Sequence, residues 1–311
     1  MSNRNQRRRE RNARQQQGNQ RPAIRIGNTQ VDVCMSVYGE WGMLHRAISC
    51  IPSAALGLGR DYRIILIDNG TPPWVPSADQ QETPVTPEQQ AEPVKKLLRP
   101  SDTFVRLEKN IGYPGAMNTA ASRGTSPYIL ITTADVYLEP AAITTMAKEL
   151  DQNEKIGVVA PLLMFPLDES PHGPPGGVQS AGIAFDIQGN PFHVFIGWTP
   201  ENPRVKIRRE MQAVTGACFM TRRSLWNQVG GFAPIYGQGT YEDMEYCFSV
   251  RSLGYSVVFQ PESQAYHFAG GSIVQGAGKS GFPLALNATI FKGRWAHALE
   301  WDAYKYLDPP K

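Results

Sequence analysis

Three carboxylates lie within four positions near the C-terminal end of the chain. The stretch GTYEDMEYCF, residues 239–248, holds Glu242, Asp243 and Glu245 among aromatic residues. Acidic side chains are favoured in the first turn of a helix, by roughly 0.3–1 kcal/mol each, because they offset the helix dipole. That preference accounts for the acids but not for their aromatic neighbours, which also suit a pocket where one carboxylate acts as a general base. An acidic helix start and a catalytic base in a pocket are therefore both open hypotheses.

Polar side chains end three of the apolar runs that precede this stretch. Asp68 and Asn69 follow IILI, Asn110 follows FVRLEK, and Asp135 ends LITTA. Ligands of an open parallel sheet gather at the carboxyl ends of its strands. Each of these residues also commonly begins a turn, so one alone carries little weight. Together they predict a ligand site along one edge of a sheet.

The elements that position these side chains alternate along the chain from residue 31. VDVCMSVY predicts a strand, WGMLHRAISCI has the apolar spacing of a helix, and YRIILID predicts a second, buried strand. This order implies an α/β fold with a mostly parallel sheet flanked by helices. Residues 71–102 are rich in Pro, Gln and Glu, so we expect a surface insertion with no packed element over most of their length. Further strands are predicted in TFVRLEKN, YILITTADVYL, IGVVAPLLMF, VTGACFMT and YSVVFQP, and further helices in GAMNTAASRG, residues 140–152, RRSLWNQVGG, YEDMEYCFSVRSLG and PLALNATIFKGRW.

The net charge of +3 conceals an uneven distribution. The first 22 residues hold seven Arg and one Glu, whereas the rest of the chain holds 24 basic and 27 acidic side chains. We expect this Arg- and Gln-rich tail to be disordered, and to be either solubilising or an arm that contacts nucleic acid or an anionic surface. The longest apolar run, IGVVAPLLMFPL, is short and broken by two prolines, so we expect no signal peptide, no transmembrane segment and a cytoplasmic protein. Four scattered cysteines are expected to be buried free thiols: Cys34, Cys50, Cys218 and Cys247.

A set of motifs occurs in one order across about residues 31–295. They are VDVCMSVYGEWGML, IILIDNG, EKNIGYPGAMNTA, ILITTADVYLEP, VTGACFMTRRSLWNQVGGF, YEDMEYCFSVRSLGYSVVFQPESQAYHFAGG and FKGRW. In this order and spacing the chain resembles family 2 of the GT-A glycosyltransferases, especially its rhamnosyltransferase-like and galactofuranosyltransferase-like branch. The resemblance implies a Rossmann-like GT-A domain over 28–270, with a nucleotide-binding half (28–140) and an acceptor half (141–270). A disordered tail (1–27) would precede it, and a lid loop with a helical extension (271–311) would follow.

The resemblance implies a nucleotide-sugar donor, with UDP, dTDP and GDP types all open. Asp68 would recognise the base, and Asn110 and Gly112 would lie beside the nucleoside. The sequence NIGYPG lacks the first Gly of the dinucleotide fingerprint, so NAD is not predicted. The donor-binding positions of the family correspond to Ser36, Tyr38, Glu40, Asp68, Asn110, Gly112 and Asp135.

The D-x-D signature of the family, which holds a divalent metal on the donor pyrophosphate, falls on Thr133, Ala134 and Asp135. The first position is neutral here, as is usual in the rhamnosyltransferase-like branch, and Asp135 is the retained ligand. His267, in AYHFAGG, matches a family histidine that completes the metal site, with a hydrogen-bonded interior histidine as the alternative. Oxygen ligands and substrate phosphates suit Mg²⁺, and imidazole favours Mn²⁺. The resemblance therefore implies Mn²⁺ or Mg²⁺ at Asp135 and His267.

The resemblance also gives the acids separate roles. Asp243 corresponds to the general base of an inverting transfer, Glu242 is expected to bind the acceptor hydroxyl, and Glu245 to be structural or orienting. Gly216 is expected to permit close approach of the acceptor sugar. Weaker expectations concern two aromatic and two basic residues: Trp198 and Trp226 stack on sugars or are buried, and Lys292 and Arg294 reach the diphosphate or solvate their helix.

Two other functions stay open. A sugar nucleotidyltransferase has a similar sheet, but this chain lacks a Gly-rich loop bearing Lys or Arg after the first strand, which that chemistry uses on a triphosphate. A catalytically silent protein that binds nucleotide sugars or nucleic acid is favoured by Thr133 and opposed by Asp135, Asp243 and His267. The resemblance therefore implies a hexosyltransferase-type glycosyltransferase that acts on a hydroxyl of a glycan or protein.

Overall fold

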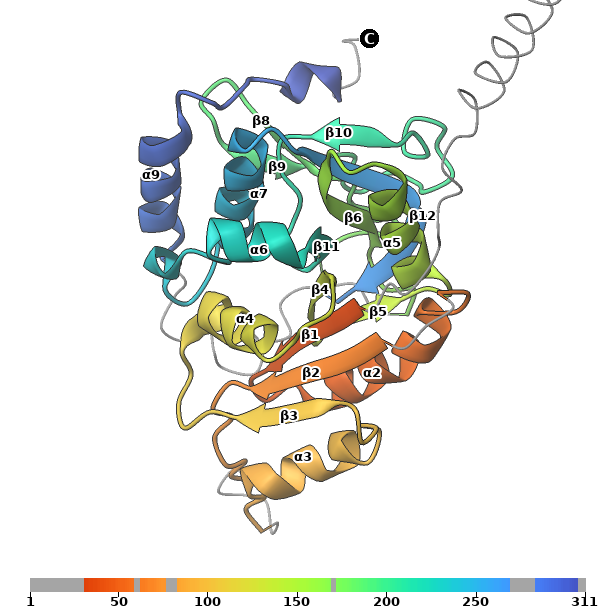
Figure 1. Cartoon of the computed structure of the whole chain (residues 1–311), viewed down its shortest axis with the longest axis vertical. Coiled ribbons are helices and arrows are strands. Elements are labelled where there is room, and N and C mark those ends of the chain that lie inside the picture. The colour runs from red at the N-terminus through yellow and green to blue at the C-terminus, as the bar shows by residue number, and fades with distance from the viewer. Residues whose placement is uncertain (1–30, 59–61, 77–82, 169–171, 269–282, 307–311) are drawn as a thin grey trace, which may run out of the picture.

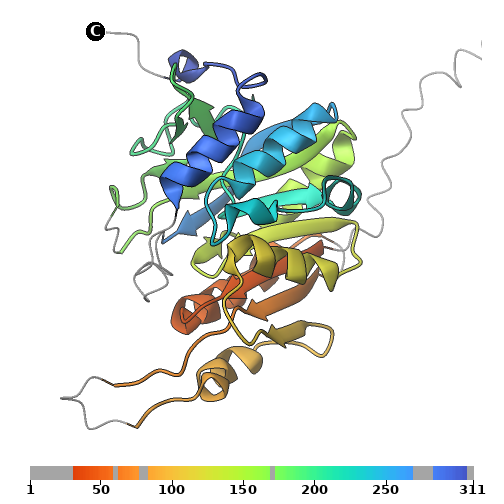
Figure 2. The ribbon, with the colours of Figure 1, turned by 90° about the vertical axis from the view of Figure 1, so that its left-hand side faces the viewer.

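A central sheet carries helices on both of its faces (Figure 1, Figure 2). The computed structural model describes residues 31–58, 62–76, 83–168, 172–268 and 283–306. The tail predicted over residues 1–27 and the lid loop predicted to begin at residue 271 lie outside the described residues.

The sheet has ten strands, with the order β10-β12-β6-β11-β4-β1-β2-β3, and β5 and β7 pair with β12 and β6. Six of the eight strands in this order run in one direction, and β11 and β10 run against them. The sheet is therefore mostly parallel, as predicted. A separate hairpin pairs β8 with β9. The strands are β1 Val31–Val37, β2 Tyr62–Asp68, β3 Thr103–Arg106, β4 Tyr128–Thr133, β5 Val136–Leu138, β6 Ile156–Met164, β7 Val178–Ser180, β8 Ile183–Phe185, β9 Pro191–His193, β10 Arg209–Met211, β11 Cys218–Arg222 and β12 Ser256–His267.

Each face of the sheet packs against its own set of helices. Along β2, Ile64 and Leu66 join one core cluster, which includes residues of α2, α3 and α5. The alternating Ile65 and Ile67 join the other cluster, which includes residues of α4, α6, α7 and α9. A strand buried on both faces is expected to be apolar at every position, which explains the continuous run IILI. The helices are α2 Trp41–Ala54, α3 Pro87–Lys95, α4 Gly112–Ser122, α5 Ala142–Gln152, α6 Arg223–Val229, α7 Glu242–Ser252 and α9 Leu284–Trp295, with 3-10 turns η1 Pro234–Tyr236 and η3 Ala303–Lys305.

Helix α3 lies where composition predicted no packed element. Thr86 caps it: the Gln89 N–H donates to Thr86 Oγ1 at 3.3 Å, and the Thr86 N–H donates to Gln89 Oε1 at 2.8 Å. Its buried residues, Ala91 and Val94, pack into the same cluster as α2. The expectation of an unpacked insertion is therefore wrong for residues 87–95, because a capping box and two apolar anchors outweigh the Pro- and Gln-rich composition.

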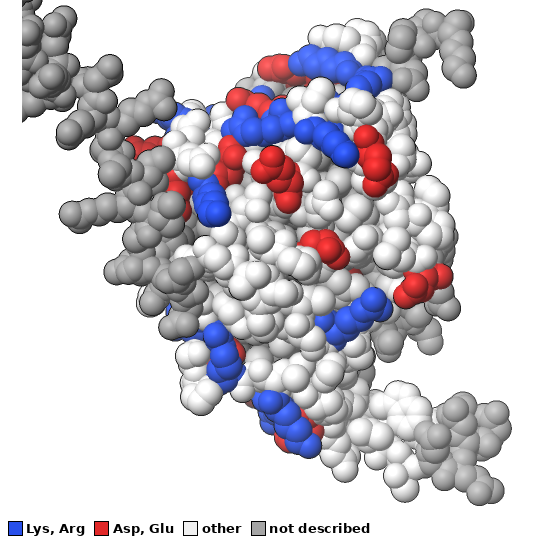
Figure 3. Space-filling model, turned by 90° about the vertical axis from the view of Figure 1, so that its right-hand side faces the viewer, with Lys and Arg blue, Asp and Glu red and all other residues white. Residues whose placement is uncertain are grey.

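Basic and acidic side chains are interspersed on the face seen in Figure 3, rather than gathered into a patch of one sign. An ion pair of 2.6 Å between Arg208 Nη2 and Glu149 Oε1 illustrates how closely the two signs can lie. A folded domain that binds nucleic acid usually presents a continuous basic surface. The described residues form no such surface on this face.

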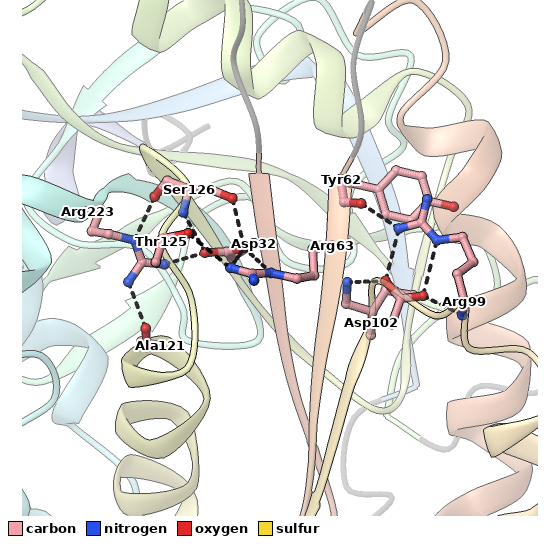
Figure 4. A network of polar contacts seen from close by, with 10 residues as sticks. Asp32, Tyr62, Arg63, Arg99, Asp102, Ala121, Thr125, Ser126 and Arg223 are labelled. Carbon is pink, nitrogen blue, oxygen red and sulfur yellow. Dashed lines mark hydrogen bonds and ion pairs between the residues drawn. The ribbon is translucent and has the colours of Figure 1, made fainter.

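A buried ion-pair network ties the amino ends of the strands together (Figure 4). Asp32, on β1, is fully buried and lies 2.6 Å from Arg223 Nη2 and 2.9 Å from Arg63 Nη2. The backbone N–H and the hydroxyl of Ser126 also donate to this carboxylate, at 2.9 and 2.8 Å. Arg223 also donates to the carbonyl of Ala121, at the end of α4, at 2.7 Å. This network joins β1, α4 and α6 at the amino ends of the strands, whereas the ligand site is predicted at their carboxyl ends.

Candidate active site

The predicted donor-binding residues of three strands lie at one edge of the sheet. Strand β1 pairs in parallel with both β2 and β4, with Val37 opposite Asp68 and Ser36 opposite Thr133. The run YILITTADVYL, predicted as one strand, is divided into β4 and β5, and Asp135 lies in the turn between them. The carboxyl ends of β1, β2 and β4 therefore meet, as the alternation of elements predicted.

The loops after β1 and β2 are tied to each other by side chains. The Tyr38 N–H donates to Glu40 Oε2 at 2.7 Å, and the Gly39 N–H donates to Thr71 Oγ1 at 3.2 Å. The Thr71 N–H donates to Asp68 Oδ1 at 2.9 Å. Glu40 is buried and shapes its own loop, whereas Ser36 and Tyr38 are partly exposed and accessible to a ligand.

Asp68 is fully buried and faces a guanidinium. Arg106 Nη1 lies 3.2 Å from Asp68 Oδ2, and Arg106 Nη2 donates to the Thr71 carbonyl at 2.9 Å. Glu88 of α3 lies 3.3 Å from the same guanidinium. A donor base that approaches Asp68 would therefore meet a carboxylate that is already paired with an arginine.

Asn69, which follows β2, organises the turn that contains Asn110 and Gly112. Its Nδ2 donates to Asn110 Oδ1 at 3.0 Å, and its Oδ1 accepts the Ile111 N–H at 3.0 Å. Gly112 has φ 79°, and a Cβ atom there would lie 2.1 Å from the carbonyl oxygen of Gly237. A glycine is thus required at position 112 by the protein backbone itself, before any contact with a nucleotide.

Asp135 and His267 come from distant parts of the chain and meet where β5 pairs with β12. Nε2 of His267 lies 3.4 Å from Asp135 Oδ1, and β12 pairs His267 with Val136 of β5. Burial alone would raise the pKa of Asp135, but the His267 charge and its hydrogen bond outweigh burial and lower it to about 2. The pair offers one carboxylate oxygen and one imidazole nitrogen. Among the described residues no group of three His, Cys, Asp or Glu side chains could hold a metal ion.

The two donor atoms nevertheless fit a divalent cation that also binds substrate phosphate. Mg²⁺ and similar ions at phosphate sites commonly take one or two protein ligands and complete their shell with phosphate oxygens and water. A carboxylate with an imidazole suits Mn²⁺ in particular. Asp135 and His267 can therefore hold such an ion only as part of a complex with a phosphate-bearing ligand.

Asp243 and Glu242 begin α7, and both resist ionisation. Asp243 Oδ2 accepts the Gly216 N–H at 2.6 Å, and Oδ1 accepts the Met244 N–H at 2.7 Å. Burial raises the pKa of Asp243 despite these two donors, which lower it. Burial and then the Asp243 charge raise the pKa of Glu242 to about 8. Glu242 is 5% exposed, and its Oε2 is buried with no hydrogen-bond partner among the described residues.

The start of α7 is strained and is held by a buried amide. Thr240 and Tyr241 have φ 75° and φ 70°, in the left-handed region that non-glycine residues rarely adopt. Nδ2 of Asn287, from α9, lies 2.8 Å from the Gly239 carbonyl and 3.1 Å from that of Thr240. Asn287 is buried, so this contact is shielded from water. Strain of this kind persists where neighbouring contacts impose it, and here it sets the direction of the turn that bears Asp243.

Gly216 links Asp243 to Tyr113, a residue that the sequence did not single out. The Tyr113 hydroxyl donates to the Gly216 carbonyl at 2.7 Å, and the Gly216 N–H donates to Asp243 Oδ2. A Cβ atom at position 216 would lie 3.1 Å from Asp243 Cβ, so glycine makes room for the acid. Burial raises the pKa of Tyr113 well above its usual range, and the charges of Glu242, Asp243 and Asp135 raise it further. The acid of the predicted metal site and the acids at the predicted base therefore both affect the pKa of Tyr113.

Glu245 is held by contacts with the C-terminal helix and does not face the other two acids. Tyr236 Oη and Arg294 Nε each donate to its carboxylate at 2.9 Å, and Trp295 Nε1 donates at 2.5 Å. Arg294 was expected to reach the diphosphate or to solvate its helix. In the structure it is paired with Glu245. Glu245 fastens α9 to α7.

The other residues given weaker roles have partners within the protein. Lys292 Nζ donates to Asn190 Oδ1 at 2.7 Å. Trp226 is buried in the core, and Trp198 is half-buried with its ring 4.7 Å from that of Phe195. Cys34, Cys218 and Cys247 are buried free thiols as expected, and Cys50 is partly exposed.

Comparison with known proteins gives one family. The model of the family described as "Glycosyl transferase family 2" matches residues 32–230. The match includes β1, β2 and β4 with Asp135. Asp243 and His267 lie beyond it.

Two curated relatives carry this similarity. The N-acetylglucosaminyl-diphospho-decaprenol L-rhamnosyltransferase of Mycobacterium tuberculosis is 24% identical over 237 residues, which cover 70% of each protein. The uncharacterized protein y4gI of Sinorhizobium fredii is 26% identical over 175 residues, which cover 54% of this chain and 18% of y4gI. The chain thus spans less than a fifth of y4gI.

Two solved structures share the fold. GalNAc-T7, solved with UDP, GalNAc and Mn²⁺, superposes with a TM-score of 0.55 at 17% identity, covering 77% of this chain and 43% of that one. The mannosyltransferase PcManGT from Pyrobaculum calidifontis, in complex with GDP-Man and Mn²⁺, gives a TM-score of 0.51 at 15% identity and covers 77% and 56%. The chain spans about half of each. No helix among the described residues is long and apolar enough to cross a bilayer.

Proposed function

This chain belongs to glycosyl transferase family 2, and we propose on that premise that it transfers a sugar from a nucleoside diphosphate sugar to a hydroxyl acceptor, with inversion. One observation carries this proposal. Asp135 lies two residues after Thr133, whose N–H donates to the Ala217 carbonyl at 3.0 Å, and the N–H of the neighbouring Gly216 donates to Asp243 Oδ2 at 2.6 Å. These contacts support a common site for the proposed metal pair and the candidate base.

The donor would lie along the carboxyl ends of β1, β2 and β4. Ser36 and Tyr38 are accessible there, Asn110 is fixed by Asn69, and Asp68 would contact the base through the groups that Arg106 leaves available. Asp135 and His267 would hold a Mn²⁺ or Mg²⁺ ion against the diphosphate. When bound, the ion neutralises the charge that develops on the departing nucleoside diphosphate. The two solved neighbours, with UDP or GDP-Man and Mn²⁺, support this choice of ligand class.

Asp243 would act as the general base. The acceptor oxygen forms a bond to the anomeric carbon while the bond from that carbon to the diphosphate oxygen breaks. The proton of the acceptor hydroxyl passes to the Asp243 carboxylate, and the nucleoside diphosphate leaves with the electron pair. A single displacement of this kind inverts the anomeric centre and needs one base.

Glu242 would bind the acceptor in its protonated form. Its pKa, raised to about 8, leaves it mainly neutral at pH 7, so it can donate a hydrogen bond as well as accept one. Its unpartnered Oε2 is the atom that an acceptor hydroxyl would satisfy. A neutral Glu242 also leaves the negative charge of the pair on Asp243, where a base requires it.

The proposal is tested by a donor screen followed by product analysis. Donor sugars on UDP, dTDP and GDP are each added with Mn²⁺, and a true donor raises the melting temperature because it binds the native state. The selected donor is then incubated with candidate glycan acceptors, and ¹H NMR gives the anomeric configuration of donor and product. Inverted configuration is expected. Retention of configuration, or absence of transfer with every pair, would contradict the proposal.

A further inference from the structure

Gln179 contacts His267 at two points. Its Oε1 lies 2.5 Å from Nδ1 of the imidazole ring, and its Nε2 donates to the backbone carbonyl of His267 at 3.1 Å. Gln179 is 7% exposed and lies on β7, next to Ser180, which is paired with Leu163 of β6. One buried amide on a strand thus holds both the ring and the main chain of a single histidine.

These two contacts determine the orientation of the amide and the tautomer of the ring. A backbone carbonyl only accepts hydrogen bonds, so the Gln179 atom that faces it must be the NH₂ group. The atom that faces the ring is then the amide oxygen, which also only accepts. Nδ1 of His267 must therefore carry a hydrogen. In the neutral ring, Nε2 keeps its lone pair.

The lone pair of Nε2 faces a carboxylate. Nε2 lies 3.4 Å from Asp135 Oδ1, so two acceptor atoms of a neutral imidazole and a carboxylate are turned toward each other. Without metal, a proton on Nε2 satisfies this arrangement, as in the hydrogen bond from His267 that lowers the pKa of Asp135. A divalent cation bound by both atoms would take the place of that proton. With the opposite tautomer, Nε2–H would point at Asp135 and would block it.

We propose that Gln179 is a positioning residue that keeps His267 in the Nδ1–H form and so presents Nε2 as a metal ligand, an inference that rests on the proposed function. Metal-binding histidines commonly donate their second N–H to such a partner, and loss of the partner lowers metal affinity about 10–100-fold. Gln179 touches neither the donor sugar nor the acceptor in this role. It acts through the ring of His267 alone.

Substitution of Gln179 separates this role from general stability. In Gln179→Leu the ring loses its Nδ1 partner, and the Asp135 carboxylate becomes the remaining acceptor, so the Nε2–H form is expected. ¹⁵N NMR of labelled histidine, recorded without metal at about pH 9, where an ordinary imidazole is neutral, reports the tautomer directly. Calorimetry with UDP present is expected to give a Mn²⁺ dissociation constant about 10–100-fold higher than in the wild type. Gln179→Glu keeps an acceptor for Nδ1–H but loses the donor to the His267 carbonyl, so it is expected to lower the melting temperature while it retains both the tautomer and the affinity.

Gln212 provides a matched control. It is 4% exposed, and it too holds one residue at two points: its Nε2 donates to the Glu300 carbonyl at 2.8 Å, and its Oε1 accepts the Glu300 N–H at 2.9 Å. Gln212→Leu removes the same kind of buried contact and is expected to lower the melting temperature. It should leave the His267 tautomer and Mn²⁺ binding unchanged.

Each outcome has a distinct meaning. A switch of tautomer with weaker Mn²⁺ binding in Gln179→Leu, but in neither Gln179→Glu nor Gln212→Leu, supports the proposal. An unchanged tautomer in Gln179→Leu, or unchanged Mn²⁺ affinity when the wild type binds the ion, overturns it. If the wild type with UDP binds no Mn²⁺, the metal site of the proposed function has failed, and the inference fails with it.

Discussion

Replacing Asp243 by Asn tests whether this carboxylate removes the acceptor proton. In the native protein its two oxygens accept the Gly216 and Met244 N–H groups, at 2.6 and 2.7 Å. Asparagine offers one oxygen and one NH₂ group, so one of these N–H groups would face another donor. The substitution therefore removes the base and also leaves one shielded donor unsatisfied.

The two effects differ in size and in the quantity that reports them. An unsatisfied buried donor costs about 1–3 kcal/mol of unfolding free energy. In a domain of this size each kcal/mol lowers Tm by about 2–4 °C. Loss of a general base lowers kcat about 10²–10⁴-fold, equivalent to about 2.7–5.5 kcal/mol on the activation barrier. The kinetic loss should therefore exceed the loss of stability.

The assay measures kcat from nucleoside diphosphate release at saturating donor and acceptor, donor affinity by calorimetry, and Tm. Asp243→Asn is expected to lower kcat by at least about 10²-fold while donor affinity stays nearly unchanged. Asp186→Asn is the matched control, since Asp186 Oδ1 also accepts two backbone N–H groups, from Gln188 and Asn190, both at 2.8 Å. Turnover of Asp243→Asn within a few-fold of the wild type would refute the assignment of the base.

Three further substitutions test the surroundings of this acid. Because burial raises the pKa of Glu242 from 4.5 to about 8, its contribution to the unfolding free energy is fully present below pH 4.5 and falls by about 1.4 kcal/mol per pH unit until it is lost above about pH 8. Glu242→Gln should therefore flatten the fall in Tm between about pH 5 and pH 8, and an unchanged slope would exclude this buried proton. Gly216→Ala places a Cβ 3.1 Å from Asp243 Cβ and should lower kcat on the order of tenfold with donor affinity retained, whereas Gly42→Ala, with open space around its Cβ, should have no effect on kcat. Arg223→Ala leaves the buried Asp32 with one fewer partner and should cost about 3–5 kcal/mol in denaturant unfolding, without a change in the donor affinity of the folded protein; a loss below 1 kcal/mol would show that the network of Figure 4 contributes little.

The fold was largely predictable because its strands are buried on both faces. Continuous apolar runs such as IILI identify strands without knowledge of their partners, and the order of strands and helices implies the parallel sheet. Helix α3 was missed because composition was averaged over residues 71–102. The local signal, TPEQ at 86–89, was present and marks a capping box.

The sequence identified candidate site residues only where a reactive side chain also lies at the end of a strand or the start of a helix. Asp135 ends an apolar run and Asp243 lies in an acidic stretch, so the sequence made both of them candidates, and the family resemblance assigned their expected roles. Tyr113 was missed because its role depends on a contact with Gly216, 103 positions away. Gln179 was missed for the same reason, since it meets His267 across 88 positions through the pairing of β7 with β6 and of β6 with β12.

Glycines showed a different gap between sequence and structure. Gly112 and Gly216 were expected to approach a nucleotide and a sugar, and those contacts remain predictions. The structure supplies a prior reason for each, because Gly237 and Asp243 occupy the space that a Cβ would need. A sequence can indicate that a position needs glycine, but the structure is needed to show which neighbouring residue occupies the space of a Cβ.

Donor binding by calorimetry, with and without Mn²⁺, tests the central claim most directly. The wild type and Asp135→Ala are titrated with the nucleoside diphosphate sugar that gives the largest thermal shift. If Asp135 and His267 hold an ion on the donor diphosphate, the wild type binds the donor tightly only with Mn²⁺, and Asp135→Ala loses this dependence together with the affinity. Equal affinity of the wild type with and without Mn²⁺ would contradict the account.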